Sequence, residues 1–249
     1  MKWNFRQDYN KTYEAYYNYS INDGFLTNAQ IYGRNPPYNL YTDDTFAAIH
    51  SMELLDLTAD RLDKSLYETM KNRKSYHTSL DSNQEINLAL ISELCAYGLI
   101  GFDESHRSYP SGGGLYDVEV NIIFNENKVD KFLTEYGNVC VFNYENKSLD
   151  YYKFTPWEEY IRPIFMQEYF VDTAKFAIVM SVNFEKHSLA YKELSYKLAL
   201  IESGHIGQNI QLASSLLELR TIPLLGFYDA DLNKIISEKQ KVIYTVLVG

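Results

Sequence analysis

The longest regular pattern in the chain is found at residues 194–219, which read LSYKLALIESGHIGQNIQLASSLLEL. Apolar residues recur there every three or four positions, which is typical of an amphipathic helix. One ridge of this helix consists of Ile206, Ile210, Ala213 and Leu217. Gly204 and Gly207 lie inside it, and a glycine in a helix costs about 1 kcal/mol relative to alanine. We therefore expect another element or a flat ligand to approach the helix closely there.

Strand-like and helix-like patterns lie on both sides of this helix. Strands are predicted at residues 118–124, 139–144, 149–154, 175–184, 221–227 and 242–248. The second and third are separated by Glu145-Asn146-Lys147-Ser148, which indicates a hairpin. Further helices are predicted at residues 60–71, 83–97 (with Asn83 as N-cap and with Gly98 and Gly101 ending the helix), 156–172 and 231–238. The pattern predicts one α+β domain over residues 61–249.

The first sixty residues are rich in Tyr and Asn and have weak periodicity. Tyr9, Tyr13, Tyr16 and Tyr17 fall at helical spacing, and Asn35-Pro36-Pro37-Tyr38 then breaks any helix. We interpret residues 1–60 as an arm that packs on its own domain or, preferably, on a second subunit. A disordered tail is the alternative, although the aromatic content argues against it.

Composition excludes several classes of protein. The 249 residues carry a net charge of −10, which argues against a nucleic-acid binder that needs a basic face. No apolar region typical of a signal peptide follows Met1, and the longest apolar run, residues 176–180, is far shorter than the ~20 residues that span a bilayer. Cys95 and Cys140 are expected to be buried thiols in a reducing compartment, so we expect a cytoplasmic protein.

Two segments could hold a phosphorylated ligand. Ser111-Gly112-Gly113-Gly114 offers backbone N–H groups and a hydroxyl to a ligand, although a bland flexible turn is equally consistent with the pattern. Arg73-Lys74-Ser75 offers a bidentate fork, an ammonium and a hydroxyl that could bind phosphate. Cations that merely complement a helix C-terminus are the simpler interpretation of that segment.

The long helix carries further candidate residues. Tyr196 and Lys197 could act as acid and base, and a solvated lysine is the simpler alternative. His205, Gln208 and Asn209 share a polar side, where a hydrogen-bonded cluster and a cofactor or interface role are equally plausible. The spacing of the five histidines matches no metal motif, so no metal site is predicted.

Taken in order, these segments resemble a known family. The order is Arg-Lys-Ser after a helix, Ser-Tyr-Pro-Ser-Gly-Gly-Gly-Leu-Tyr-Asp-Val-Glu-Val, then Glu-Ser-Gly-His-Ile-Gly-Gln-Asn-Ile-Gln-Leu-Ala, then Ile-Pro-Leu-Leu-Gly-Phe and a final Leu-Val-Gly. This series resembles the SagB-type, McbC-like dehydrogenases of the nitroreductase superfamily from about Leu62 to Gly249. The resemblance implies an α+β fold with a central, mostly antiparallel sheet flanked by helices, in a homodimer with FMN at the subunit interface.

The resemblance also implies cofactor contacts. Arg73, Lys74 and Ser75 would bind the phosphate and ribityl chain of FMN, and Ser111, Gly112 and Gly113 would meet the flavin ring. Gln208 and Asn209 would face the cofactor or the partner subunit, and the backbone of Leu225 and Gly226 would approach the cofactor. Tyr109, Tyr116 and Tyr196 would surround the ring and the peptide, whereas the tyrosines of the arm would lie at the dimer interface.

The family oxidises thiazoline and oxazoline rings to thiazoles and oxazoles in ribosomally made peptides, after a separate cyclodehydratase has formed the azolines. Its members use a Lys-Tyr pair, whereas here Lys197 is preceded by Tyr196 and followed by Leu198. The resemblance therefore implies Lys197 as the base and leaves the tyrosine's role open. The expected partners are a modified precursor peptide, a cyclodehydratase and a second copy of the chain. The alternatives are a general NAD(P)H-dependent nitroreductase and a non-catalytic scaffold of a peptide-modifying complex.

Overall fold

The computed structural model describes residues 64–100, 106–184, 194–237 and 239–249. Nearly all of them lie within one compact unit, Ser65–Gly249. The predicted arm over residues 1–60 lies outside the described residues and stays a prediction. No helix in the described part of the chain is long and apolar enough to cross a bilayer.

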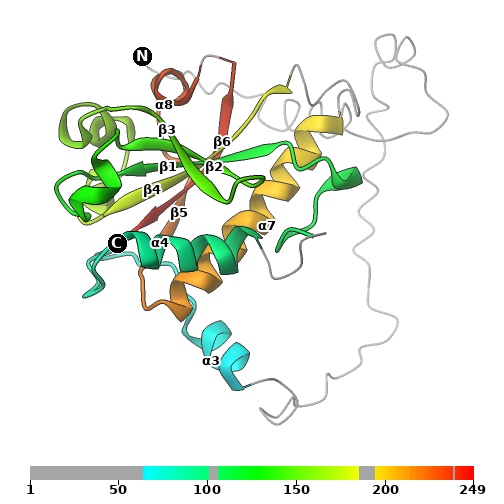
Figure 1. The fold of residues 1–249 in the computed structure, drawn as a ribbon, viewed down its shortest axis with the longest axis horizontal. Coiled ribbons are helices and arrows are strands. Elements are labelled where there is room, and N and C mark those ends of the chain that lie inside the picture. The colour runs from blue at the N-terminus through cyan, green and yellow to red at the C-terminus, as the bar shows by residue number, and fades with distance from the viewer. Residues whose placement is uncertain (1–63, 101–105, 185–193, 238) are drawn as a thin grey trace, which may run out of the picture. The chain divides into compact units, whose positions relative to one another are not determined.

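A six-stranded sheet forms the centre of the domain, as Figure 1 shows. Its strands, in spatial order, are β3 (Ser148–Lys153), β2 (Val139–Asn143), β1 (Val118–Phe124), β4 (Phe176–Val182), β6 (Lys241–Val248) and β5 (Thr221–Leu224). All five neighbouring pairs are antiparallel. Every residue of β4 is buried, because β1 and β6 flank it and helices cover both of its faces. The predicted antiparallel sheet, its hairpin and its central strand are confirmed.

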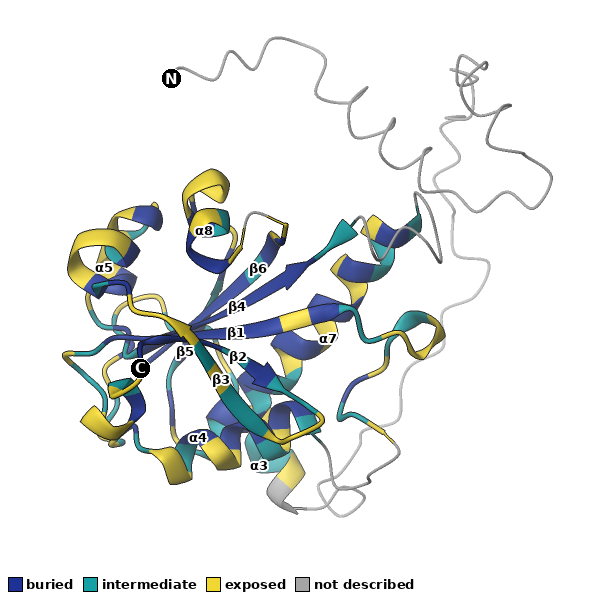
Figure 2. Ribbon diagram, turned by 45° about the horizontal axis from the view of Figure 1, so that its top comes forward, coloured by how far each residue is buried: buried dark blue, intermediate teal, exposed yellow. Residues whose placement is uncertain are grey.

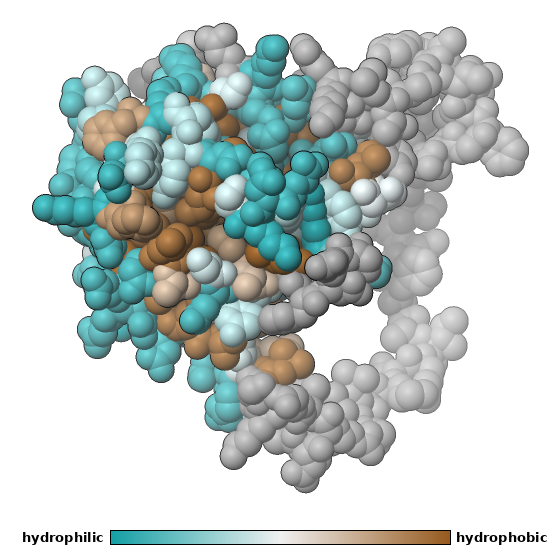
Figure 3. Space-filling view, viewed as in Figure 1, coloured by the Kyte–Doolittle hydropathy of each residue, from teal (hydrophilic) through white to brown (hydrophobic). Residues whose placement is uncertain are grey.

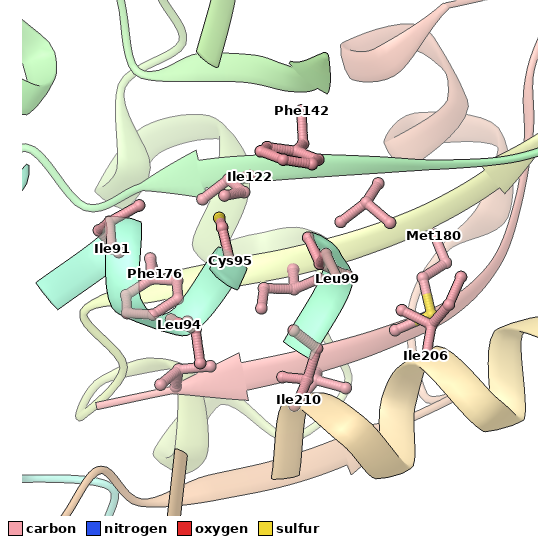
Figure 4. Packing of buried hydrophobic residues seen from close by; sticks show 14 of the residues in the cluster. Ile91, Leu94, Cys95, Leu99, Ile122, Phe142, Phe176, Met180, Ile206 and Ile210 are labelled. Carbon is pink, nitrogen blue, oxygen red and sulfur yellow. The ribbon is translucent and has the colours of Figure 1, made fainter. Parts of the chain in front are cut away.

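Helices pack on both faces of this sheet, where side chains alternate between the faces because the strand period is two. The helices are α3 (Lys64–Asn72), α4 (Leu88–Cys95), α5 (Glu168–Val171), α7 (Leu194–Leu216) and α8 (Asp229–Ile236). Figure 4 shows α4 and α7 packing on one face, with Cys95, Ile122, Met180 and Ile210 in the same core. The opposite core contains Trp157, Ile164 and Phe170 with Leu232 of α8. Figure 2 shows the buried strands between these layers and the exposed outer faces of the helices.

Two predicted helices differ from the observed ones. Helix α4 begins at Leu88 with Asn87 as its N-cap, whose side chain accepts from the N–H of Leu90 at 3.0 Å, so the predicted cap at Asn83 is wrong. The helix continues past Gly98 as a π-helical turn, Ala96–Ile100, and Gly101, the second predicted terminator, lies outside the described residues. Residues 156–172 form three short pieces, Trp157–Ile161, Arg162–Ile164 and α5, because Pro163 cannot continue a regular helix.

Both cysteines are buried and free, as predicted. Burial raises the pKa of the Cys95 thiol to about 12 and also raises the pKa of Cys140. The two residues therefore serve as small apolar side chains in the core.

Candidate functional site

The Ser-Gly-Gly-Gly turn lies against the N-terminal half of α7. The Ser111 hydroxyl donates to Glu202 Oε2 at 2.5 Å, and the N–H of Val118 donates to Glu202 Oε1 at 3.3 Å. Gly112 sits so close to Leu198 that a Cβ there would lie 2.9 Å from Leu198 Cδ2. Contacts on both sides of the turn thus hold it on the helix, and a side chain at position 112 would require the Leu198 side chain to move.

The outer side of this turn is open. Gly113 and Gly114 adopt φ values of 66° and 67°, which favour glycine. No atom lies within 4 Å of the position that a Cβ on Gly114 would take. Among the described residues, the N–H groups of Gly112 and Gly113 donate no hydrogen bond. An open glycine turn with two such N–H groups has the donors that the ring nitrogens and carbonyls of a flavin could accept.

A group of cations lies near the C-terminal half of α7. Arg73 follows α3 and donates from Nη1 to Gln211 Oε1 at 3.1 Å, and Ser75 forms a bridge to Thr221 of β5. The ammonium of Lys74 and the guanidinium of Arg220 lie 4.8 and 5.2 Å from the centroid of the Tyr76 ring. The resulting concentration of positive charge could hold a phosphate.

Helix α7 connects these two places. Leu198 contacts the glycine turn and Gln211 contacts Arg73, and thirteen residues of helix separate the two contacts by about 20 Å at 1.5 Å per residue. The structure therefore brings the predicted phosphate segment and the predicted ring segment onto one helix, at separate positions along it.

Lys197 and Tyr196 lie at the end of α7 that carries the glycine turn. Lys197 is half-buried and immediately precedes Leu198, the residue that touches Gly112. Tyr196 is exposed, and its ring centroid lies 5.7 Å from that of Phe184. The predicted base and the predicted ring-binding turn therefore share one turn of α7.

The other predicted contacts fall into two places. Asn209 donates from Nδ2 to the carbonyl of Ser108 at 2.7 Å and ties the segment before the glycine turn to α7, whereas Gln208 is exposed. Leu225 is exposed and Gly226 packs against Gln167, with the Gly226 carbonyl accepting from the N–H of Met166 at 2.8 Å. Residues 225 and 226 follow Leu224, the last residue of β5, and therefore lie at the opposite end of this strand from Thr221.

An aromatic cluster braces the segment before the turn. The hydroxyls of Tyr109 and Tyr144 lie 2.7 Å apart, and Arg107 donates to Tyr109 at 3.1 Å. The guanidinium of Arg107 lies 3.4 Å from the centroid of the Tyr144 ring and 4.4 Å from that of Tyr116. Burial raises the pKa of Tyr109. Tyr109 is 2 % exposed, so its ring packs in the core of this cluster.

Three contributors to this site, Glu202, Gln211 and Arg220, were not predicted. Glu202 had a visible signal, because it lies four residues before Ile206 on the apolar ridge of the helix and is 2 % exposed. A carboxylate in an apolar stripe indicates a buried partner. Gln211 and Arg220 had no such signal, because their contacts come from residues far away in the sequence.

A separate apolar pocket lies away from these residues. It has a volume of about 560 Å³ and opens between α4 and the β2–β3 hairpin, with Leu88, Tyr136 and Leu149 in its lining. None of the predicted site residues lines it. On the face drawn in Figure 3, hydrophobic side chains gather in a central area bordered by hydrophilic ones.

The chain is similar at low identity to two relatives. It is 21 % identical over 159 residues to a protein of Methanocaldococcus jannaschii named as a nitroreductase, MJ1384, with 62 % of this chain and 75 % of that protein covered. It is 26 % identical over 157 residues to the microcin B17-processing protein McbC of Escherichia coli, with 57 % of this chain and 52 % of McbC covered.

The fold is also similar to a solved structure. The E. coli microcin synthetase McbBCD complex with truncated pro-MccB17 bound contains a chain that superposes with a TM-score of 0.69 at 18 % identity. The match covers 82 % of this chain and 76 % of that one. Residues 70–249 match the model of the nitroreductase family. Because that match spans most of the sequence and the antiparallel sheet with its covering helices agrees with it, the chain belongs to the nitroreductase family.

Proposed function

We propose that this protein is an FMN-dependent dehydrogenase that oxidises thiazoline and (methyl)oxazoline rings to thiazoles and (methyl)oxazoles in a ribosomally synthesised peptide. The observation that carries the proposal is the placement of an open glycine turn and a cationic group on one helix, with Lys197 beside the turn. The similarity to McbC supports a role in peptide modification.

The residues present fit FMN, an elongated molecule with a phosphate at one end and a ring at the other. Arg73, Lys74 and Ser75, joined by Arg220, would hold the phosphate and ribityl chain. The turn would present the N–H groups of Gly112 and Gly113 to the ring, and a Cβ at position 112 would disturb the turn's seat on Leu198. Gln208 and Asn209 on α7, and the backbone of Leu225 and Gly226, complete the set that we propose for the cofactor or the partner subunit.

Bound FMN would supply a two-electron acceptor for hydride. Oxidation of an azoline removes one carbon-bound proton and one hydride and creates one ring double bond. In our proposal Nζ of Lys197 takes that proton, and the half-buried position of Lys197 limits the water that competes for it. Tyr196 would lie beside the peptide and orient the azoline by hydrogen bonding.

The outer face of α7 supports a homodimer. Leu200 and Ile201 are 41 and 49 % exposed, and Gly204, one turn further along α7, has no neighbouring atom within 4 Å of its Cβ position. A helix face with large apolar side chains around a glycine suits close packing of a second helix. We propose that two copies meet there. We also propose that a cyclodehydratase delivers the modified peptide, and that the protein is cytoplasmic, where its two free cysteines stay reduced.

Cofactor content and turnover test this proposal directly. The purified protein should carry a yellow flavin chromophore and should remove two hydrogen atoms per ring from a peptide that a cyclodehydratase has converted to azolines. Lys197→Ala should retain FMN and lose turnover, whereas Lys239→Ala, an exposed lysine away from α7, should keep both. Failure to bind FMN at saturating concentration would leave the scaffold alternative. Full turnover by Lys197→Ala would remove Lys197 from the chemistry.

A general NAD(P)H-dependent nitroreductase is the second candidate, because the M. jannaschii relative is named as a nitroreductase. Rapid bleaching of the bound flavin by NADPH alone, without oxidation of an azoline peptide, would favour this candidate. Ile201→Glu should convert a dimer to a monomer in size-exclusion chromatography with light scattering, and an unchanged dimer would place the interface elsewhere.

A further inference from the structure

The Glu202 carboxylate is buried in the middle of α7. It is 2 % exposed and accepts from the Ser111 hydroxyl at 2.5 Å and from the N–H of Val118 at 3.3 Å. The Ser111 oxygen in turn accepts from the N–H of Tyr116 at 2.9 Å. One carboxylate therefore joins the helix to both ends of the segment that contains the glycine turn.

The geometry of that segment explains why it needs such a link. Gly113, Gly114 and Tyr116 all adopt positive φ, at 66°, 67° and 51°. The turn has two internal hydrogen bonds, from the N–H of Gly114 to the Ser111 carbonyl at 3.0 Å and from the N–H of Leu115 to the Gly112 carbonyl at 3.5 Å. Glycine has more backbone freedom to lose on ordering than other residues, so contacts from α7 add to the order of a turn of three glycines. The contacts of this turn with α7 come from Glu202, through Ser111, and from Leu198, through Gly112.

The same contacts change the expected role of Ser111. Its hydroxyl hydrogen is donated to Glu202 and its oxygen accepts from Tyr116, so the hydroxyl is used inside the protein. The N–H groups of Gly112 and Gly113 donate to no other described residue. Ser111 thus transmits the position of α7 to the turn, and the glycine N–H groups remain available to a ligand.

We propose that Glu202 is a positioning residue, which acts through Ser111 to fix the glycine turn so that the N–H groups of Gly112 and Gly113 meet the flavin ring. This inference rests on the proposed binding of FMN. Because the carboxylate is buried near the turn, its charge also acts on the ring.

Burial raises the pKa of the Tyr109 hydroxyl, and the charge of Glu202 adds a minor effect in the same direction. A negative charge near the ring disfavours the anionic reduced flavin, and burial strengthens this effect because the local dielectric is low. Removal of the charge should therefore make the midpoint potential of the bound flavin more positive.

Three variants distinguish the positioning effect of Glu202 on the turn from the effect of its charge on the flavin. Glu202→Gln removes the charge and disturbs the link, Ser111→Ala removes the link and keeps the charge, and Glu218→Gln makes the same change at an exposed position after α7. FMN affinity is measured by quenching of flavin fluorescence, the potential by dye-coupled titration, and exchange of the backbone N–H groups of residues 108–118 by mass spectrometry without FMN.

We expect Glu202→Gln and Ser111→Ala to weaken FMN binding about tenfold or more and to speed exchange in residues 108–118, with β4 and β6 unchanged. Only Glu202→Gln should raise the potential, and Glu218→Gln should match the wild type. Wild-type affinity, exchange and potential in Glu202→Gln would overturn the inference while FMN binding by the wild type stands. If the wild type binds no FMN, the proposed function itself fails and this inference falls with it. If Glu202→Gln does not fold, Ser111→Ala decides by exchange and affinity.

Discussion

Two alanine substitutions in α7 give a matched test of how this helix packs on the sheet. A Cβ on Gly207 would lie 2.5 Å from Cε1 and 3.3 Å from Cδ1 of Tyr244 on β6, whereas a Cβ on Gly204 would have no atom within 4 Å. Carbon atoms normally approach no closer than about 3.5 Å. The ring of Tyr244 or the helix must therefore move in Gly207→Ala, whereas nothing within a single copy of the domain needs to move in Gly204→Ala.

The expected effect is the difference in free energy of unfolding between the two variants, in which the gain in helix propensity cancels. Both substitutions gain about 1 kcal/mol because alanine replaces a helical glycine. Gly207→Ala alone carries an overpacking cost of about 1–3 kcal/mol. We therefore expect Gly204→Ala to be more stable than Gly207→Ala by about 1–3 kcal/mol, at roughly 2–4 °C in Tm for each kcal/mol in a domain of this size.

Urea unfolding followed by circular dichroism measures the difference between the two variants, both made in the Ile201→Glu background so that the proposed dimer contact around Gly204 is absent. Addition of Tyr244→Ala to each variant completes a double-mutant cycle, and the difference should shrink once the ring is gone. Equal stability of Gly204→Ala and Gly207→Ala in the presence of Tyr244 would refute the steric explanation, and with it the role of Gly207 as the site of close approach.

Three further predictions concern other parts of the domain. Arg73→Met should lower FMN affinity about 10- to 100-fold, because a hydrogen bond to a charged group is worth about 1.5–3 kcal/mol. Its affinity for riboflavin, which has no phosphate, should stay unchanged. Equal losses of affinity for both ligands in fluorescence titrations would show that Arg73 does not bind the phosphate. The hydrogen bond from Arg162 at 2.5 Å lowers the pKa of Asp172 from its usual 3.8. The stability from this pair is therefore present above pH 3.8 and lost as the pH falls through the lowered pKa, so urea midpoints of the wild type and Arg162→Met should converge in acid. Cys95, with its pKa raised to about 12, should resist iodoacetamide in the native protein at neutral pH and react after unfolding; rapid native labelling by mass spectrometry would contradict its burial.

The sequence patterns predicted the strands and α7 well because their periodicity is strong. The predicted strand at 175–184 corresponds to β4, whose seven residues are all buried. The start of α4 was mispredicted because two asparagines, Asn83 and Asn87, both precede apolar residues, and only tertiary packing decides between them. Residues 83–87 are not helical, and Ile86 packs in the core. The break in residues 156–172 could have been predicted, since Pro163 lies inside the segment.

The sequence indicated which segments form the candidate site, but it did not indicate the hydrogen bonds that join them. The glycine turn and the Arg73 segment stand out by residue type, but the bonds that fix them join residues 91 and 138 positions apart. Such pairs depend on how the sheet and α7 are stacked, which a single sequence does not encode locally. The aromatic cluster follows the same logic, because the hydroxyls of Tyr109 and Tyr144 meet only when β2 lies beside the segment before the turn.

The strand order of the sheet also has a consequence for how the chain acquires its structure. Strand β4 pairs with β6, yet Val182 ends β4 and Lys241 begins β6, so α7, β5 and α8 come between the partners in the sequence. Closing so long a loop costs chain entropy before any pairing energy is gained, which slows folding. Until β6 arrives, β4 presents an unpaired apolar edge of the kind that recruits other chains. Substitutions in β6 are therefore expected to reduce the yield of folded protein from synthesis more than they reduce the equilibrium stability of the finished domain.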